Sequence, residues 1–255
     1  MNRFEGRRVL VTGGGSGIGR ATALRVLEEG GRVVAFDVNA EGLAATAERA
    51  GTRADRLTTS VVDISDETAV RAGAAAAVET LGGLDVLVNA AGILRSAHTH
   101  QTTLEFWNRV LAVNLTGTFL MTREALPALL ESGRGVVVNF SSTSASFAHP
   151  YMAAYAASKG GIQSFTHVLA AEYAGRGLRA VAVAPGSISS DMTDGRGPGL
   201  PGDADMSLFA KLVPALNQGG FAPPETVAGV VAALASDDGA FVTGTEIRID
   251  GGTHF

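Results

Sequence analysis

Seven short runs of β-branched and other apolar residues recur along the chain, separated by longer, alanine-rich stretches of helical character. The runs lie at residues 8–12, 32–37, 56–63, 84–89, 135–141, 178–184 and 246–250. The segment Val136-Val-Val-Asn-Phe140 is apolar without alternation, which is typical of a strand covered on both faces. The pattern predicts an α/β fold with a doubly wound, seven-stranded parallel sheet flanked by helices on both faces.

No proline- or serine-rich linker and no internal repeat interrupts this alternation. The 255 residues are therefore expected to form a single domain spanning residues 1–255. One segment, residues 187–222, is rich in glycine, proline and aspartate and is longer than most connections inside a domain. We interpret it as a substrate-binding loop.

Composition and charge exclude several classes of function. The net charge of -5, with arginines scattered along the chain, provides no broad basic surface, so nucleic acid is not an expected partner. No apolar stretch reaches the 18 or so residues of a membrane span, and the N-terminal apolar run is too short for a signal peptide. The chain contains no cysteine, which fits a reducing compartment. We expect a cytoplasmic protein.

A glycine-rich loop, Thr12-Gly-Gly-Gly-Ser-Gly-Ile-Gly19, lies between the first run and a helical stretch. Glycines at such a turn let the backbone approach a pyrophosphate at the helix N-terminus, which predicts a Rossmann-type dinucleotide site, although such a turn also serves as a plain β-to-α connection. The next strand ends at Asp37, 18 residues beyond Gly19. A carboxylate there binds the ribose 2′-hydroxyl and repels a 2′-phosphate, so NAD is the predicted cofactor; capping the following loop is the alternative role. The predicted cofactor-binding residues of this half are Gly13, Ser16, Gly17, Ile18, Gly19 and Asp37.

Tyr155 and Lys159 stand four residues apart in a chain with three tyrosines and two lysines. Residues at positions i and i+4 share a helical face, so the phenol and the ammonium are expected to point the same way. A cation beside a phenol favours the phenolate and would lower the tyrosine pKa towards neutrality. Packing of the lysine stem along a surface tyrosine is the alternative interpretation of the pair.

Taken together, these motifs resemble the short-chain dehydrogenase/reductase family from about Gly6 to Gly252. The glycine loop resembles the family's cofactor loop, Asn89-Ala-Ala-Gly92 its fourth-strand motif, and Tyr155-x-x-x-Lys159 its active-site signature. The resemblance implies that Ser142, 13 residues before Tyr155, is the catalytic serine, and that Asn114 anchors a proton-conducting water. Further cofactor contacts that the resemblance implies are Asp63, Ile64, Asn89, Ala90, Gly92, Tyr155, Lys159, Pro185, Gly186, Ile188 and Ser190.

The reaction implied is hydride transfer between a secondary alcohol or ketone and the nicotinamide of NAD(H), with Tyr155 as the acid/base, Lys159 and Ser142 as its partners and Asn114 behind them. The alternatives are a 3-oxoacyl thioester (acyl carrier protein) reductase and a non-catalytic dinucleotide sensor. No metal is expected, although His98, His100 and His149 are a conceivable ligand set; His149, Phe147 and Met152 are expected to shape the substrate pocket instead. The resemblance also implies a homotetramer built partly through the helices that carry Met121 and Phe165 and through the final strand.

Overall fold

Seven parallel strands form one sheet in the order β3-β2-β1-β4-β5-β6-β7, which confirms the predicted fold class. The structure, a computed structural model, describes residues 2–190, 199–216 and 220–254. The strands are β1 (Arg8–Thr12), β2 (Arg32–Asp37), β3 (Leu57–Val61), β4 (Val86–Asn89), β5 (Val136–Phe140), β6 (Arg179–Pro185) and β7 (Thr245–Ile249). The helices are α1 (Gly17–Glu28), α2 (Ala40–Ala50), α3 (Glu67–Leu81), α4 (Leu104–Leu111), α5 (Gly117–Glu131), α6 (Ala153–Tyr173) and α7 (Pro224–Ala235).

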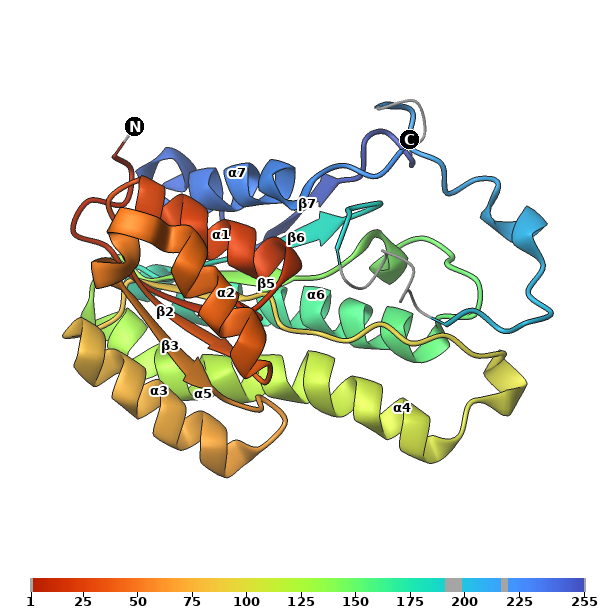
Figure 1. Ribbon diagram of the computed structural model, residues 1–255, viewed down its shortest axis with the longest axis horizontal. Coiled ribbons are helices and arrows are strands. Elements are labelled where there is room, and N and C mark those ends of the chain that lie inside the picture. The colour runs from red at the N-terminus through yellow and green to blue at the C-terminus, as the bar shows by residue number, and fades with distance from the viewer. Residues whose placement is uncertain (1, 191–198, 217–219, 255) are drawn as a thin grey trace.

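Helices cover both faces of the sheet, as Figure 1 shows, with α1, α2 and α7 on one side and α3, α4, α5 and α6 on the other. Alternate side chains of each strand enter the two cores. In β1, Val9 and Val11 face the α1 and α7 side, whereas Leu10 faces the α3 and α5 side. This double coverage is the reason that the strands read as continuous apolar runs in the sequence.

The predicted strand boundaries are wrong by one or two residues at several ends. The largest difference is at β3, predicted over 56–63 and found at Leu57–Val61. Beyond Val61 the amide of Val62 still donates to the Asp37 carbonyl at 3.0 Å, but the chain then turns, and Asp63 accepts from the Ser65 amide at 2.8 Å. This local side-chain turn competes with the sheet and ends the strand.

Polar side chains join the carboxyl ends of β4 and β5 to the helices behind them. Asn89 pairs in register with Asn139, and its Nδ2 donates to Asn139 Oδ1 at 2.9 Å and to Thr122 Oγ1 at 3.0 Å. Asn139 Nδ2 donates in turn to Thr166 Oγ1 on α6 at 2.9 Å. This buried chain of hydrogen bonds fixes α5 and α6 relative to the strand ends, where the functional site lies.

At the amino ends of the strands, Asp85 is fully buried and forms ion pairs with two arginines. Its carboxylate accepts from Arg8 Nε and from Arg134 Nε at 3.0 Å each, and also from the Arg8 backbone amide at 2.9 Å. Burial alone would raise the pKa of Asp85, but the hydrogen bonds from Arg8 and Arg134 outweigh it and lower the pKa to about 2.

We predict that Asp85→Asn lowers the free energy of unfolding at neutral pH by about 2 to 3 kcal/mol, because two arginines lose their buried counter-charge. The folded-state pKa lies below the ordinary 3.8, so this contribution is present above about pH 4 and disappears as the pH falls towards 2. Urea unfolding of wild type and variant between about pH 2 and pH 7 measures this difference in the free energy of unfolding. Asp55→Asn, at an exposed position, is the control, and equal stability of the two variants at pH 7 would contradict the assignment.

Candidate functional site

The glycine loop between β1 and α1 is packed so closely that larger residues are excluded. A Cβ on Gly13 would lie 2.9 Å from the Ala91 backbone, and one on Gly19 would lie 2.1 Å from the Gly13 carbonyl oxygen. Gly13 also adopts a φ of +72°, which side chains disfavour. Ser16 precedes α1 without capping it through its side chain, so the first amides of the helix have no cap from that residue. Such an N-terminus binds a phosphate.

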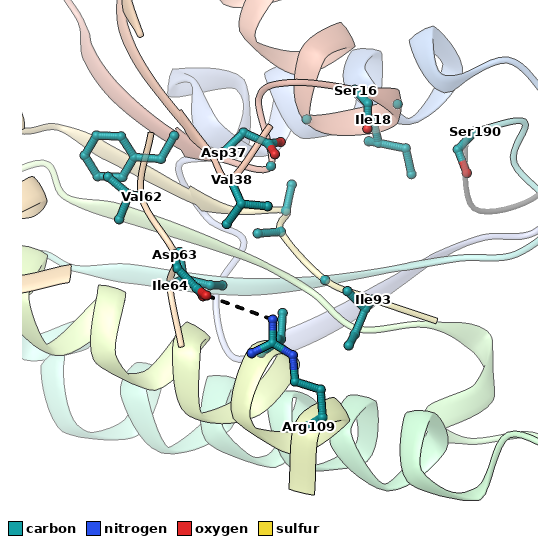
Figure 2. A pocket seen from close by; sticks show the side chains of 18 residues that line it. Ser16, Ile18, Asp37, Val38, Val62, Asp63, Ile64, Ile93, Arg109 and Ser190 are labelled. Atoms are coloured by element: carbon teal, nitrogen blue, oxygen red, sulfur yellow. Dashed lines mark ion pairs between the residues drawn. The ribbon is translucent and has the colours of Figure 1, made fainter. Parts of the chain in front are cut away.

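A cavity of about 230 Å³ lies beside this loop, at the ends of β2 and β4 (Figure 2). Asp37 lines it, and its two carboxylate oxygens accept hydrogen bonds from the amides of Gly15 and Asn39 at 2.9 Å each. Asp37 therefore also caps the loop, as the alternative interpretation held. An ionised carboxylate has about four acceptor sites, so capping leaves acceptor capacity for a ribose hydroxyl.

The other wall of this cavity is formed by Asp63 and by Arg109 of α4, which reaches towards it in Figure 2. Arg109 lies 3.9 Å from the Asp63 carboxylate and donates to Ser65 Oγ at 3.1 Å. A hydrogen bond from the Ser65 side chain is the main cause that lowers the pKa of Asp63, and Arg109 adds to it. The two carboxylates, Asp37 and Asp63, thus face one cavity from neighbouring strand ends.

A second cavity, of about 490 Å³, adjoins the first and shares Ile18, Ala90, Gly92 and Ser190 with it. Ser142, Tyr155 and Lys159 all line it. Lys159 follows Tyr155 by one turn of α6, and its Nζ donates to the Phe140 carbonyl at 2.7 Å and lies 5.5 Å from the centre of the Tyr155 ring. The two side chains therefore point into the same space, as the spacing predicted.

Asn114 stands behind this cavity and does not line it. It lies in a π-helical turn, Ala112–Thr116, between α4 and α5. Its Oδ1 accepts from the Ile93 amide at 2.8 Å, and its Nδ2 donates to the Ile93 carbonyl at 3.0 Å and to Ser158 Oγ at 3.1 Å. Asn114 thus holds the segment after β4 against α6, which carries Tyr155 and Lys159.

This geometry agrees with the similarity of the chain to known proteins. A family profile described as short chain dehydrogenase matches residues 7–200. The chain belongs to the short-chain dehydrogenase family. As a member of that family it is an oxidoreductase that acts on alcohols or ketones.

Three curated relatives of this short-chain dehydrogenase differ in the substrates that their names state. It is 38% identical over 250 residues to a D-threitol dehydrogenase from Mycolicibacterium smegmatis, with 98% of this chain and 94% of the relative covered. It is 40% identical over 255 residues to a 2-(S)-hydroxypropyl-CoM dehydrogenase from Xanthobacter autotrophicus, with 98% of each covered. It is 38% identical over 250 residues to a 3-oxoacyl-(acyl-carrier-protein) reductase from Thermotoga maritima, with 98% of each covered.

Two solved short-chain dehydrogenases with the same fold hold different cofactors. One from Mycobacterium paratuberculosis, bound to NAD, matches with a TM-score of 0.91 and 28% identity, covering 98% of each chain. One from Burkholderia cenocepacia, in complex with NADP, matches with a TM-score of 0.87 and 32% identity, covering 99% of each chain. A nicotinamide dinucleotide is therefore the cofactor of this family, and the tight glycine loop and the two adjoining cavities of this chain fit one.

Lys159 was expected to lower the pKa of Tyr155, but the pKa of Tyr155 is raised in this short-chain dehydrogenase. Burial raises the pKa of Tyr155, and the hydrogen bond with Ser142 only partly opposes this. Burial also lowers the pKa of Lys159 from 10.5 to about 8. The physical reason is that the Lys159 ammonium is directed at the Phe140 carbonyl and is itself removed from water. The proton thus resides on Tyr155 at neutral pH.

Most residues predicted for the site line one of the two cavities. The first cavity contains Gly13, Ser16, Gly17, Ile18, Gly19, Asp37, Asp63, Ile64, Ala90, Gly92 and Ser190. The second contains Ser142, Tyr155, Lys159, Pro185, Gly186, Ile188 and Ser190. Asn89 and Asn114 line neither, because their side chains are engaged in the buried hydrogen bonds described above.

The substrate side of the pocket was predicted only in part. His149 and Met152 line the second cavity, whereas Phe147 does not and instead stacks on His254. Sequence reasoning missed His254 and Arg109, since neither belongs to a motif. Residues 191–198 and 217–219 of the expected substrate loop lie outside the described residues; its described part contributes Leu200, Phe209, Leu212, Val213, Pro214 and Phe221 to the cavity.

His98, one of the three histidines considered as metal ligands, lines neither cavity and contacts other side chains of the protein. His98 lies 2.9 Å from Asp203, and its ring packs edge-on against Tyr151. Tyr151 in turn accepts a hydrogen bond from the Asp205 amide at 2.8 Å. These contacts join residues 203–205 of the expected substrate loop to the segments that carry His98 and Tyr151. Within the described residues, no three His, Cys, Asp or Glu side chains are grouped as metal ligands. No helix in that part of the chain is long and apolar enough to cross a membrane.

We predict that Lys159→Met raises the free energy of unfolding at pH 7 by up to about 3 kcal/mol, because it removes a buried charge whose folded-state pKa is depressed. Turnover should fall by at least about a hundredfold. The gain in stability should shrink as the pH rises from about 8 towards 10.5, where folded wild type is already neutral. Urea unfolding at several pH values measures it, with Lys211→Met, at the exposed lysine, as control. A Lys159→Met variant less stable than wild type at pH 7 would show that the buried charge of Lys159 does not oppose folding.

Proposed function

We propose that this short-chain dehydrogenase is an NAD(H)-dependent oxidoreductase that interconverts a secondary alcohol and a ketone, with Tyr155 as the acid/base. The observation that carries the proposal is the convergence of Ser142, Tyr155 and Lys159 on one cavity that adjoins a second, carboxylate-lined cavity beside the glycine loop.

In ketone reduction, Ser142 donates a hydrogen bond to the substrate oxygen and stabilises the negative charge that develops there. Tyr155 gives its phenolic proton to the same oxygen, and the raised pKa of Tyr155 keeps that proton available at neutral pH. The bound nicotinamide supplies the hydride, or accepts it in the reverse direction.

The residues around Tyr155 restore and direct its proton. Lys159, with its pKa lowered to about 8, is suited to exchange protons near neutrality and to hold the nicotinamide ribose through its ammonium. Asn114 acts through Ile93 and Ser158 and positions α6 for this step. In the oxidative direction Tyr155 must accept a proton, so the raised pKa implies that alcohol oxidation accelerates with rising pH.

Asp37 supports NAD over NADP, because its carboxylate lies at the end of β2, where an adenosine ribose is held in this fold. Arg20, the first cation after the glycine loop, donates to Thr46 Oγ1 at 2.9 Å, to the Gly42 carbonyl at 3.2 Å and to the Gly15 carbonyl. These bonds hold the guanidinium between α2 and the glycine loop. A 2′-phosphate beside Asp37 would meet a like charge.

A 3-oxoacyl thioester reductase is the second candidate, favoured by the 3-oxoacyl-(acyl-carrier-protein) reductase among the relatives. The two functions differ in the surface that they need, since an acidic carrier protein requires a basic patch. A non-catalytic sensor is disfavoured because the three catalytic side chains are present and converge. The cytoplasmic location and the homotetramer remain predictions; α5 and α6 do expose the apolar side chains of Phe119 and Val168.

We predict that Tyr155→Phe retains the NADH dissociation constant within about threefold and loses turnover by about a thousandfold or more, because only the transferable proton is removed. Fluorescence titration with NADH and a steady-state assay with assorted secondary alcohols measure the two quantities. Tyr173→Phe is the matched control, since Tyr173 lines neither cavity. Retained turnover in Tyr155→Phe would refute the role of Tyr155.

We predict that wild type binds NADH at least about a hundredfold more tightly than NADPH, because of the charge on Asp37. Asp37→Asn keeps the shape of the side chain and removes that charge, so it should bind NADPH at least about tenfold more tightly than wild type does. Asp55→Asn should change neither affinity. Tighter binding of NADPH than NADH by wild type would reject the NAD assignment and favour the thioester reductase.

A further inference from the structure

Two histidines border the substrate cavity, and their ring nitrogens differ in whether they have partners. His149 Nδ1 lies 3.1 Å from the Phe147 carbonyl and its Nε2 lies 3.3 Å from Thr143 Oγ1, so both nitrogens are engaged. His254 Nδ1 lies 3.1 Å from Asp250 Oδ2. In the described part of the chain, the buried Nε2 of His254 has no hydrogen-bond partner.

The C-terminal turn holds His254 in place. Gly251 and Gly252 adopt φ values of +62° and +75°, which bring the chain back over Asp250 after the end of β7. Asp250 accepts from the amides of Gly252 at 3.1 Å and His254 at 3.3 Å. The Phe147 ring stacks on the imidazole with 4.0 Å between centroids and 17° between planes. The side chain of His254 is only 10% exposed.

The bond to Asp250 fixes the chemistry of the free nitrogen. A carboxylate only accepts, so the proton of the neutral imidazole resides on Nδ1 and Nε2 presents a lone pair. Burial would raise the pKa of Asp250, but hydrogen bonds from His254 and Gly252 outweigh it and lower the pKa, which keeps the carboxylate ionised. His254 Nε2 is therefore a buried acceptor that lacks a donor, an arrangement that proteins rarely leave unsatisfied.

The rest of the cavity wall indicates what kind of group supplies that donor. Among the described residues that line the cavity, none is Asp, Glu or Arg, so a charged substrate group would lack an opposite charge away from the catalytic residues. Thr143 is engaged by His149, and Thr253 Oγ1 donates to the Asp250 carbonyl at 2.7 Å. The remainder of the wall is mostly apolar. A neutral donor, the hydroxyl group, fits this environment.

We propose that His254 is a specificity-determining residue that accepts a hydrogen bond from a second hydroxyl group of the substrate, so that the enzyme prefers diols and hydroxy ketones to simple mono-alcohols. The inference rests on the proposed function, because His254 lies in the same cavity as Ser142 and Tyr155. Asp250 acts through His254 as a positioning residue.

The kinetic test compares kcat/KM for butane-2,3-diol with that for butan-2-ol in wild type and variants. Wild type should prefer the diol at least about tenfold, because the mono-alcohol leaves the buried acceptor unsatisfied. His254→Phe keeps a ring to stack on Phe147 and should reduce the ratio to within about threefold of one, mainly through a loss on the diol. His254→Gln keeps a polar group and should retain part of the preference. His167→Gln, on the exposed face of α6, should leave the ratio unchanged. Absence of a preference in wild type, or an unchanged ratio in His254→Phe, overturns the proposal.

A binding measurement separates this proposal from the proposed function. With nitrogen-15 histidine, the Nε2 resonance of His254, assigned by its loss in His254→Phe, should shift on addition of butane-2,3-diol in the presence of NAD. Butan-2-ol should shift it far less. A selective shift without turnover supports the role of His254 and contradicts the oxidoreductase proposal for this substrate class. Turnover of both alcohols without a selective shift supports the oxidoreductase and overturns the role of His254.

Discussion

Removal of both faces of a parallel sheet from water is the constraint on which the rest of this structure depends. Polar side chains are tolerated in such a layer only where neighbours satisfy them. The chain places them at the strand ends. At the amino ends of the strands Asp85 binds two arginines, and near the carboxyl ends Asn89 and Asn139 link strands to helices. The carboxyl ends of the strands are therefore linked to α5 and α6 by buried side-chain hydrogen bonds.

The same burial creates a conflict between stability and chemistry at Lys159. A lysine removed from water opposes folding in its charged form, which is why its pKa falls to about 8. The charged form is partly stabilised by the Phe140 carbonyl at the end of β5, which accepts a hydrogen bond from the ammonium. Asn114 holds the segment after β4 against α6, the helix that carries Lys159. The π-helical turn at Ala112–Thr116 gives Asn114 that position. Proton exchange near neutrality is the property that such burial provides.

The sequence predicted the layered fold and the common direction of Tyr155 and Lys159, because both depend on local sequence patterns. Doubly buried strands read as apolar runs, and Tyr155 and Lys159 share one turn of helix whatever the tertiary structure is. Strand ends were less predictable, since the turn at Asp63 depends on a side-chain hydrogen bond from Ser65. Arg109 and His254 were missed because their roles arise from tertiary placement: α4 carries Arg109 to a distant strand end, and two glycines fold His254 back over Asp250. The direction of the Tyr155 pKa shift was wrong because spacing gives proximity and not burial.

The two cavities discriminate between ligands by different physical means. Both carboxylates that face the cofactor side, Asp37 and Asp63, belong to the first cavity, and Arg109 offsets the charge of Asp63 only. Under the proposed function, charge repulsion at Asp37 would reject a phosphorylated ribose. On the substrate side, the described wall lacks Asp, Glu and Arg, so Coulomb attraction contributes little to selection away from the catalytic residues. Discrimination there must come from shape and from hydrogen bonds that a poorly matched substrate leaves unmade. The fixed imidazole of His254 would satisfy that requirement under the proposal above, because a substrate without the second hydroxyl leaves the buried Nε2 without that donor.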